Sequence, residues 1–278
     1  MIRIISNDWC SFDEKYQKLK VVVQNLGKVL VAFSGGVDST FLLKITKDLL
    51  PAEHVLAVTA LSDTMARQEY IDARAYAKAL GVEHVLVESK ELDIPEFVQN
   101  PPDKCYICKK HRFGKLVEIA SNRGFDFVAD GENIDDKLDF RPGSLAAKEL
   151  GIRSPLQEAG LTKKDIRFLS RELSLPSWNK PSFACLASRI PYYQTITKQK
   201  LVQVDKAEEF LRKLEFIPQL RVRHYGDTAR IEMDAKDMDK LAEKGLRKKI
   251  VHHFRLLGFK FITMDLDGYR MGSLNREI

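Results

Sequence analysis

The sequence contains a short string of small, polar and acidic residues, Ser34-Gly35-Gly36-Val37-Asp38-Ser39. Paired glycines let the backbone turn tightly and bring its N–H groups close to an anion. A helix that begins near Ser39 would point its free N–H groups and the positive end of its dipole at the same place. Ser34 and Ser39 can donate to phosphate oxygens, whereas Asp38 is better suited to hold Mg²⁺ or to cap the helix. The string predicts a phosphate-binding loop, and the simpler alternative is a Gly-Gly turn capped by Asp38.

Three of the four cysteines stand in contexts typical of ligands. Cys105 and Cys108 form a Cys-x-x-Cys pair after two prolines, and Cys185 lies in the segment KPSFACLASRIP, whereas Cys10 has no such context. Three thiolates can hold three irons of a [4Fe–4S] cluster and leave the fourth iron open to a ligand such as sulfide. A zinc site, which would need a fourth ligand, a redox dithiol and isolated buried cysteines are the alternatives.

The elements around these residues indicate an α/β fold. Short apolar runs alternate with helix-like segments through the first half of the chain, which predicts a parallel sheet covered by helices on both faces. We expect strands at 29–33, 55–60, 84–87 and 125–129, and helices at 12–26, 41–50, 66–80 and 109–122. Ligands of such sheets lie beyond the carboxyl ends of the strands. Thr59 and the loop that contains Gly131, Asn133 and Asp136 follow such ends.

The pattern changes after residue 140, and the rest of the chain mixes helices and strands. We expect helices at 162–174, 198–215 and 235–257, the last interrupted near Gly245, and strands at 220–224, 229–233 and 259–265. The domain prediction has three parts: a nucleotide-binding domain at 1–175, a functional linker at 176–197 that carries Cys185, and a small α+β domain at 198–278 for substrate binding and oligomerisation.

Composition excludes several classes of protein. A hydrophobic fraction of 44%, with 15 Gly and 10 Pro in 278 residues, excludes a disordered or collagen-like chain. No apolar run approaches the roughly 18 residues of a membrane span, and no secretory signal is recognisable, so we expect a cytoplasmic protein without a membrane partner. Most of the net charge of +6 lies in 198–278. That excess is either a solvated surface or an attraction for phosphate or nucleic acid.

The string SGGVDST resembles the PP-loop of the ATP pyrophosphatase superfamily, whose domains are adenine nucleotide alpha hydrolase-like. This superfamily cleaves ATP to AMP and pyrophosphate while it adenylates a carbonyl or carboxylate oxygen. Gly131, Asn133 and Asp136 resemble its second nucleotide loop, of the form Gly-x-Asn-x-x-Asp. The string is not a Walker A loop, because no Gly-Lys-Ser or Gly-Lys-Thr follows it.

Nearly the whole chain resembles the LarE family of ATP-dependent sulfur transferases. The resemblance rests on SGGVDST, NPPDKCYICKKHRF, DGENIDDKLDFRPG, GIRSPL, KPSFACLASRIPY and RVRHYGDTARIE. The family converts the carboxylates of pyridinium-3,5-biscarboxylic acid mononucleotide to thiocarboxylates for the nickel-pincer nucleotide cofactor of lactate racemase. One branch sacrifices a cysteine sulfur, and another uses three cysteines around a [4Fe–4S] cluster that relays sulfide. Cys105, Cys108 and Cys185 match the second branch.

The resemblance implies ATP, Mg²⁺ and a [4Fe–4S] cluster as cofactors, and sulfide or another sulfur donor as a partner. It also implies catalytic roles for Cys185, Asp38 and Arg189. Because phosphates need cations, Arg141, Arg221 and Arg223 are predicted to bind the substrate nucleotide. Arg221 and Arg223 alternate on one expected strand and therefore face the same side.

Glu209 and Glu232 are further candidates, for a metal ion near the active site. We also expect a homo-oligomer. Two other functions fit parts of the pattern. A tRNA thiolation enzyme would use the same chemistry but needs a basic RNA-binding surface, and no RNA-binding module is recognisable. A non-catalytic nucleotide sensor would not need Asp38 together with both serines.

Overall fold

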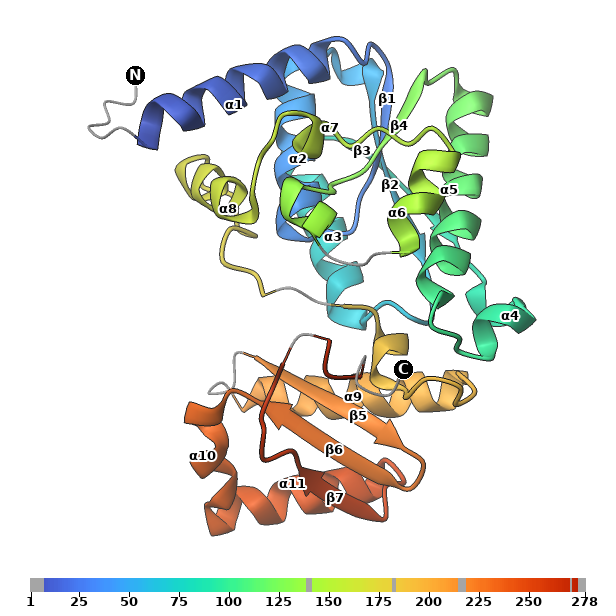
Figure 1. The fold of residues 1–278 in the computed structure, drawn as a ribbon, viewed down its shortest axis with the longest axis vertical. Coiled ribbons are helices and arrows are strands. Elements are labelled where there is room, and N and C mark those ends of the chain that lie inside the picture. Colours follow the sequence, from blue (N-terminus) through green and yellow to red (C-terminus); the bar gives the residue numbers. More distant parts are fainter. Residues whose placement is uncertain (1–7, 139–141, 182–183, 215–218, 271, 275–278) are drawn as a thin grey trace. The chain divides into compact units, whose positions relative to one another are not determined.

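The computed structural model describes residues 8–138, 142–181, 184–214, 219–270 and 272–274 (Figure 1). The chain forms two compact units. Unit 1 contains Met1–Leu61, Gln68–Ser89 and Cys105–Ser182, and unit 2 contains Ser62–Arg67, Lys90–Lys104 and Phe183–Ile278. This division differs from the expected boundaries at 175 and 197. The last boundary lies at Ser182, and two short segments of the first half of the chain belong to unit 2. No described helix is long and apolar enough to cross a membrane.

Unit 1 is built on a four-stranded parallel sheet in the order β3-β2-β1-β4, which confirms the predicted sheet. The strands are β1 (Val29–Ala32), β2 (Val55–Leu61), β3 (Glu83–Glu88) and β4 (Phe127–Ala129). In the central strand β1, Val29 pairs with Val55 on one side and with Phe127 on the other. Since both edges and both faces of β1 are covered, its first three residues are fully buried, as a continuous apolar run predicts.

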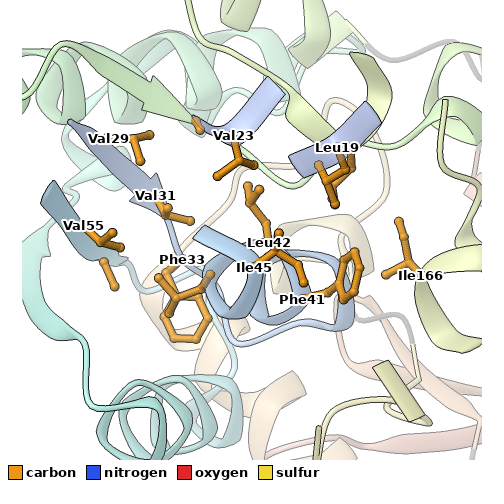
Figure 2. Close-up of a cluster of buried hydrophobic side chains, with 14 of the residues drawn as sticks. Leu19, Val23, Val29, Val31, Phe33, Phe41, Leu42, Ile45, Val55 and Ile166 are labelled. Atoms are coloured by element: carbon orange, nitrogen blue, oxygen red, sulfur yellow. The ribbon is translucent and has the colours of Figure 1, made fainter. Parts of the chain in front are cut away.

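Helices cover both faces of this sheet. They are α1 (Asp8–Gln24), α2 (Val37–Leu49), α3 (Arg67–Leu80), α5 (Lys104–Arg123), α6 (Pro142–Glu149), α7 (Pro155–Glu158) and α8 (Lys163–Glu172). Side chains alternate along a strand, so Val29 and Val31 pack with α1 and α2, while Leu30 belongs to a second cluster with α5. Figure 2 shows the first cluster, in which Phe41 of α2 and Ile166 of α8 extend the core.

The start of α8 matches its sequence signature. The Thr162 Oγ1 accepts a hydrogen bond from the Asp165 N–H at 3.1 Å, and the Asp165 carboxylate accepts one from the Thr162 N–H at 2.9 Å. This capping box satisfies two N–H groups that the helix leaves free. It fixes the first turn of α8, which carries Lys163.

Unit 2 contains a three-stranded sheet in the order β5-β6-β7, which confirms a small second domain with mixed elements. β5 (Leu220–Tyr225) pairs antiparallel with β6 (Thr228–Met233), and β7 (Phe261–Met264) pairs parallel with β6. The helices of this unit are α4 (Pro95–Val98), α9 (Lys198–Lys213), α10 (Met238–Ala242) and α11 (Lys244–Leu256). Short 3-10 turns of the two units are η1 (Ala52–His54), η2 (Glu91–Asp93), η3 (Ile134–Leu138), η4 (Leu186–Arg189) and η5 (Ala235–Asp237).

Hydrogen bonds join the early segments of unit 2 to its later part. The side-chain amide of Asn100, which is fully buried, donates to the carbonyls of Ile190, Pro191 and Gln194 at 3.2, 2.6 and 3.1 Å. The Leu186 N–H donates to the Thr64 carbonyl at 2.8 Å. Unit 2 is therefore assembled from three separate pieces of chain.

Candidate active site

The predicted phosphate loop connects β1 to α2, where a nucleotide-binding loop is expected. Gly35 has a φ of 70°, and a Cβ on it would lie 2.8 Å from the Ala73 Cα, so only glycine fits there. The N-cap of α2 is Gly36, which has no side chain to cap the first turn. The first N–H groups of α2 therefore remain suited to bind an anion.

Two serines hold this loop in shape. The Oγ atoms of Ser34 and Ser39 lie 3.1 Å apart. Ser34 Oγ also accepts a hydrogen bond from the Gly36 N–H at 3.3 Å, and Ser39 Oγ donates to the Gly36 carbonyl at 3.3 Å. The structure thus brings together Ser34, Gly36 and Ser39 as the sequence predicts, in a loop that is preorganised before any ligand binds.

Asp38 lies at the start of α2 and forms an ion pair with Lys163 of α8 through its Oδ2 atom. Its other oxygen, Oδ1, is buried and has no hydrogen-bond partner within the described residues. Burial raises the pKa of Asp38, while the charge of Lys163 lowers it and Asp136 raises it further. An unpartnered carboxylate oxygen beside a phosphate loop suits a hard cation, which needs oxygen ligands.

The second predicted nucleotide loop packs against the first. A Cβ on Gly131 would lie 2.9 Å from the backbone nitrogen of Ser39, so the two loops are in direct contact. The Asp136 carboxylate accepts a hydrogen bond from the Asn133 N–H at 2.9 Å, and the Asn133 side chain accepts one from the Asp135 N–H at 3.0 Å. These bonds fix the loop after β4 at the carboxyl edge of the sheet.

Beside this loop lies a pocket of about 440 Å³, lined among others by Glu132, Asp136, Ser144 and Gln157. Asp130 is buried next to it and accepts hydrogen bonds from the Ser154 hydroxyl at 2.8 Å and the Glu132 N–H at 3.1 Å. Burial, assisted by the charge of Glu132, raises the pKa of Asp130 to about 6. Sequence analysis missed this carboxylate, although it precedes the predicted loop by one residue.

Thr59, which was also predicted to contact the nucleotide, has a buried side chain that bonds protein groups. Its side chain is buried, and its hydroxyl bonds the Phe33 carbonyl at 2.6 Å and the His84 Nε2 at 2.8 Å. Burial, followed by the charge of Arg74, lowers the pKa of His84. Thr59 therefore holds the chain immediately before the phosphate loop.

In unit 2, Arg189 is 1% exposed, and each nitrogen of its guanidinium has a partner. Nε and Nη2 donate to the two carboxylate oxygens of Glu208 at 2.8 and 3.2 Å. Nη1 donates to the carbonyls of Ala184 and Cys185 at 2.9 and 3.2 Å. Arg189 was predicted to be catalytic, and the contacts show that it holds the turn that carries Cys185.

Arg221 and Arg223 are also buried, and both lie near carboxylates. Arg223 forms an ion pair with Glu232 at 2.7 Å and donates to the Ser188 carbonyl at 2.7 Å, but its Nε is buried without a described partner. Burial, with the nearby charge of Arg189, lowers the pKa of Arg221 to about 10. We call Arg189, Arg221, Arg223, Glu208 and Glu232 the arginine cluster.

The remaining predicted site residues differ in their surroundings. Glu232 is fully buried and bonds Arg223, whereas Glu209 lies on the exposed side of α9 and pairs with Lys213 at 2.7 Å. The carboxylate that α9 buries is the neighbouring Glu208. Arg141 lies outside the described residues.

The three candidate cysteines form no disulfide within the described residues, and they are distributed over both units. Cys105 and Cys108 lie on the first turn of α5 in unit 1, and Cys185 belongs to unit 2. Within the described part of the chain, no three His, Cys, Asp or Glu side chains form a group that could hold a metal ion. The [4Fe–4S] cluster stays a prediction.

The fold and the phosphate loop together define the PP-loop class of ATP-using α/β enzymes. In agreement, a family model described as NAD synthase matches residues 12–104. The chain is 39% identical to the pyridinium-3,5-bisthiocarboxylic acid mononucleotide synthase of Lactiplantibacillus plantarum, over 94% of both chains. The chain belongs to the family of this synthase, which confirms the resemblance to the LarE family.

Two further relatives are similar to this chain over most of its length. An uncharacterized protein of Synechocystis is 40% identical over 96% of this chain and 98% of its own length. An uncharacterized protein of Methanocaldococcus jannaschii is 30% identical over 87% of this chain and 91% of its own. Because each match covers at least 87% of this chain, both units have counterparts in these relatives.

Proposed function

We propose that this protein is an ATP-dependent sulfur transferase that acts on pyridinium-3,5-biscarboxylic acid mononucleotide. It adenylates a carboxylate of this substrate, releases pyrophosphate, and replaces the activated oxygen by sulfur to give a thiocarboxylate. The observation that carries the proposal is the near full-length similarity to a pyridinium-3,5-bisthiocarboxylic acid mononucleotide synthase, combined with an intact phosphate loop.

Adenylation addresses the poor reactivity of a carboxylate, whose oxygen is a bad leaving group. Transfer of AMP to the carboxylate gives a mixed anhydride, and AMP leaves from it when sulfur attacks the acyl carbon. In this step the N–H groups at the start of α2, together with Ser34 and Ser39, hold the phosphates. The unpartnered Oδ1 of Asp38 fits Mg²⁺, which would neutralise the charge of the pyrophosphate. Lys163, which forms an ion pair with Asp38, supplies a second positive charge.

The substrate also carries a phosphate, for which Arg223 is the best-supported ligand of this chain. Its buried Nε lacks a described partner, so an anion oxygen would satisfy a donor that is otherwise unpaired. Arg221 lies two residues before Arg223 on β5 and therefore faces the same side of the strand. Its guanidinium lies 5.0 Å from the centre of the Tyr269 ring. Arg189 then acts by holding the Cys185 turn.

For the sulfur step we propose the three-cysteine route. Cys105, Cys108 and Cys185 would hold a [4Fe–4S] cluster whose open iron carries sulfide. The alternative is that Cys185 gives up its own sulfur and ends as dehydroalanine. The two routes differ in what they leave behind, since only the second consumes the protein.

The primary test measures pyrophosphate release with ATP and the biscarboxylate nucleotide. We expect release that depends on the nucleotide, and loss of release in Asp38→Ala. Asp48→Ala, on the exposed end of the same helix, is the matched control and should retain activity. Release that depends instead on added tRNA would favour a tRNA thiolation enzyme, and ATP binding without any release would indicate a sensor.

A second test separates the sulfur routes. The protein is reconstituted with iron and sulfide without oxygen, and then turnovers and intact mass are measured. More than one transfer per chain with unchanged mass supports the cluster, and Cys10→Ser should behave like the unmodified protein. Loss of one H₂S per transfer, with no iron bound, would show that Cys185 is sacrificed.

A further inference from the structure

A chain of hydrogen bonds in unit 1 leads from β3 to the phosphate loop. The Nε2 atom of His84 lies 2.8 Å from the Thr59 Oγ1, which lies 2.6 Å from the Phe33 carbonyl oxygen. Phe33 is the last residue before the loop, and its N–H still bonds the Val58 carbonyl at 2.8 Å, which continues the pairing of β1 with β2. The chain leaves the sheet at the Phe33 carbonyl, and a side-chain hydroxyl holds that carbonyl.

The direction of these bonds follows from the atoms that form them. A carbonyl oxygen can only accept, so the single proton of the Thr59 hydroxyl goes to Phe33. The Thr59 oxygen then accepts from His84, whose Nε2 must carry a proton. Burial, followed by the charge of Arg74 on α3, lowers the pKa of His84, which favours a neutral ring with this one proton. The ring is therefore a donor with a defined direction.

The other side of the same peptide group belongs to the phosphate loop. The Phe33 carbonyl and the Ser34 N–H share one peptide plane, so a bond that fixes one also fixes the other. The Ser34 N–H donates to the Ser39 Oγ at 3.3 Å, and that hydroxyl donates to the Gly36 carbonyl at 3.3 Å. His84 is thus connected to Ser39, a predicted phosphate ligand, through a continuous series of donors and acceptors.

Packing holds the ring and the loop in the same core. The His84 and Phe33 rings meet edge to face, with their centres 5.7 Å apart and their planes at 84°. Ala73 of α3 belongs to the apolar cluster that contains Phe33, and a Cβ on Gly35 would lie 2.8 Å from the Ala73 Cα. Because protein interiors are close-packed, a change at the His84 ring is transmitted to the start of the loop.

We propose that His84 is a positioning residue for the phosphate loop. Through Thr59 it fixes the peptide between Phe33 and Ser34, and this peptide sets the direction in which the Ser39 hydroxyl meets a phosphate oxygen. The inference rests on the proposed function, in which this loop holds ATP. It assigns His84 no contact with the phosphates, and the effect of His84 on ATP is one of geometry.

The first experiment measures the affinity for a non-hydrolysable ATP analogue by calorimetry, and the free energy of unfolding in urea. Thr59→Val removes the hydroxyl with little change of shape and should weaken binding about tenfold, whereas Thr59→Ser keeps the hydroxyl and should bind within about twofold of normal. His84→Phe keeps a ring but removes the donor and should weaken binding about fivefold. His84→Gln supplies an amide N–H in place of Nε2–H and should restore most of this loss.

Thr46 provides the matched control for a purely structural effect. Its hydroxyl is also fully buried and donates to a carbonyl, that of Leu42 at 2.8 Å, toward the far end of α2. Thr46→Val should lower the free energy of unfolding and leave the affinity for the ATP analogue unchanged. If Thr59→Val also loses stability without losing affinity, the hydrogen-bond chain is only part of the framework and the proposal is wrong.

The second experiment locates the proton in the unmodified protein, by NMR of isotope-labelled histidine, with His84→Gln used to assign the signal. We expect a neutral ring with its proton on Nε2 at neutral pH. A proton on Nδ1 alone would mean that the Thr59 hydroxyl donates to His84 and not to Phe33. That result would overturn the proposal, and it does so even where a variant fails to fold.

The remaining outcomes separate this proposal from the proposed function. If the unmodified protein does not bind the ATP analogue, the proposed function is contradicted. If it binds the analogue and His84→Phe binds it equally well, His84 does not position the loop, whatever the result for Thr59→Val.

Discussion

The phosphate loop of unit 1 leaves polar atoms without partners, whereas the arginine cluster of unit 2 satisfies most of its own charge. Among the described residues, Asp38 Oδ1 has no hydrogen-bond partner, and no side chain caps the first turn of α2. Arg189 and Glu208 are both buried and form an ion pair at 2.8 Å, and each has further protein partners, among them the Cys185 carbonyl and the Val222 N–H. Burial without a partner marks a place for a ligand, and burial with a partner marks the framework that holds it.

The largest expected effect concerns Glu208. Burial raises the pKa of this carboxyl, but Arg189 and Arg212 outweigh it and lower the pKa below its usual value. Glu208→Ala leaves Arg189 charged, buried and unpaired, and should lower the free energy of unfolding by about 3–5 kcal/mol. Glu209→Ala, one residue along α9, removes an exposed pair and should cost about 0.5 kcal/mol.

Urea unfolding of both variants measures this difference. If the two losses are equal and small, the arginine cluster is not a framework, and the comparison with the phosphate loop fails.

The next effect is a pH dependence that arises from Asp130. Its pKa of about 6 in the folded protein lies above the value of 3.8 for a free aspartate, because burial and Glu132 disfavour the charge. The folded state therefore binds the proton more tightly than the unfolded state between about pH 4 and 6. Stability falls as pH rises through this window, by roughly 3 kcal/mol in total.

Asp130→Asn keeps both hydrogen-bond acceptor contacts and removes the charge. Its free energy of unfolding should exceed that of the unmodified protein at pH 8, and the two should converge near pH 4. An identical pH profile for both proteins would mean that folding does not raise the pKa of Asp130.

Contact between the two nucleotide loops gives a smaller effect. Gly131→Ala places a methyl group 2.9 Å from the Ser39 nitrogen and should separate the loops. We expect ATP binding to weaken about tenfold, or about 1.4 kcal/mol, in calorimetry. Gly114→Ala, in the open middle of α5, should leave binding unchanged and stabilise the helix by up to about 1 kcal/mol.

The smallest effect compares helix caps in the two units. Thr162→Ala removes the Oγ1 acceptor of the capping box, keeps the bond from the backbone N–H of residue 162 to Asp165, and should lower the free energy of unfolding by about 1 kcal/mol. Thr197→Ala removes a single cap bond of 3.2 Å at the start of α9 and should cost less. Equal losses in thermal unfolding would show that the Oγ1 bond of the box is no stronger than the single cap bond of α9.

The sequence predicts what is local and misses what is distant. The sheet and the cap of α8 follow from short patterns and are confirmed, whereas the loop between β1 and α2 has the predicted position and its binding of phosphate stays a prediction. The partners of Asp38 and Gly35 lie 125 and 145 residues away along the chain, so no local pattern indicates Lys163 or Lys180.

Helical spacing in the sequence could have distinguished Glu208, which is buried, from Glu209, which was predicted to bind a metal ion. Leu201, Val204 and Leu211 define the buried side of α9, and helical spacing places residue 208 on that side and residue 209 beside it. Arg221 and Arg223 were expected to bind phosphate, but their carboxylate neighbours become visible only once strands and helices are assembled.

The three-piece construction of unit 2 also has a consequence for synthesis of the chain. The ribosome synthesises segments 62–67 and 90–104 long before segment 183–278. The two early segments of unit 2 therefore emerge before the residues that they contact. The side-chain amide of Asn100 can form its hydrogen bonds only after Ile190, Pro191 and Gln194 have been synthesised. Unit 1 can fold while translation continues, whereas unit 2 can complete its fold only at the end. A fragment that begins at residue 183 therefore lacks two of the segments that make up unit 2.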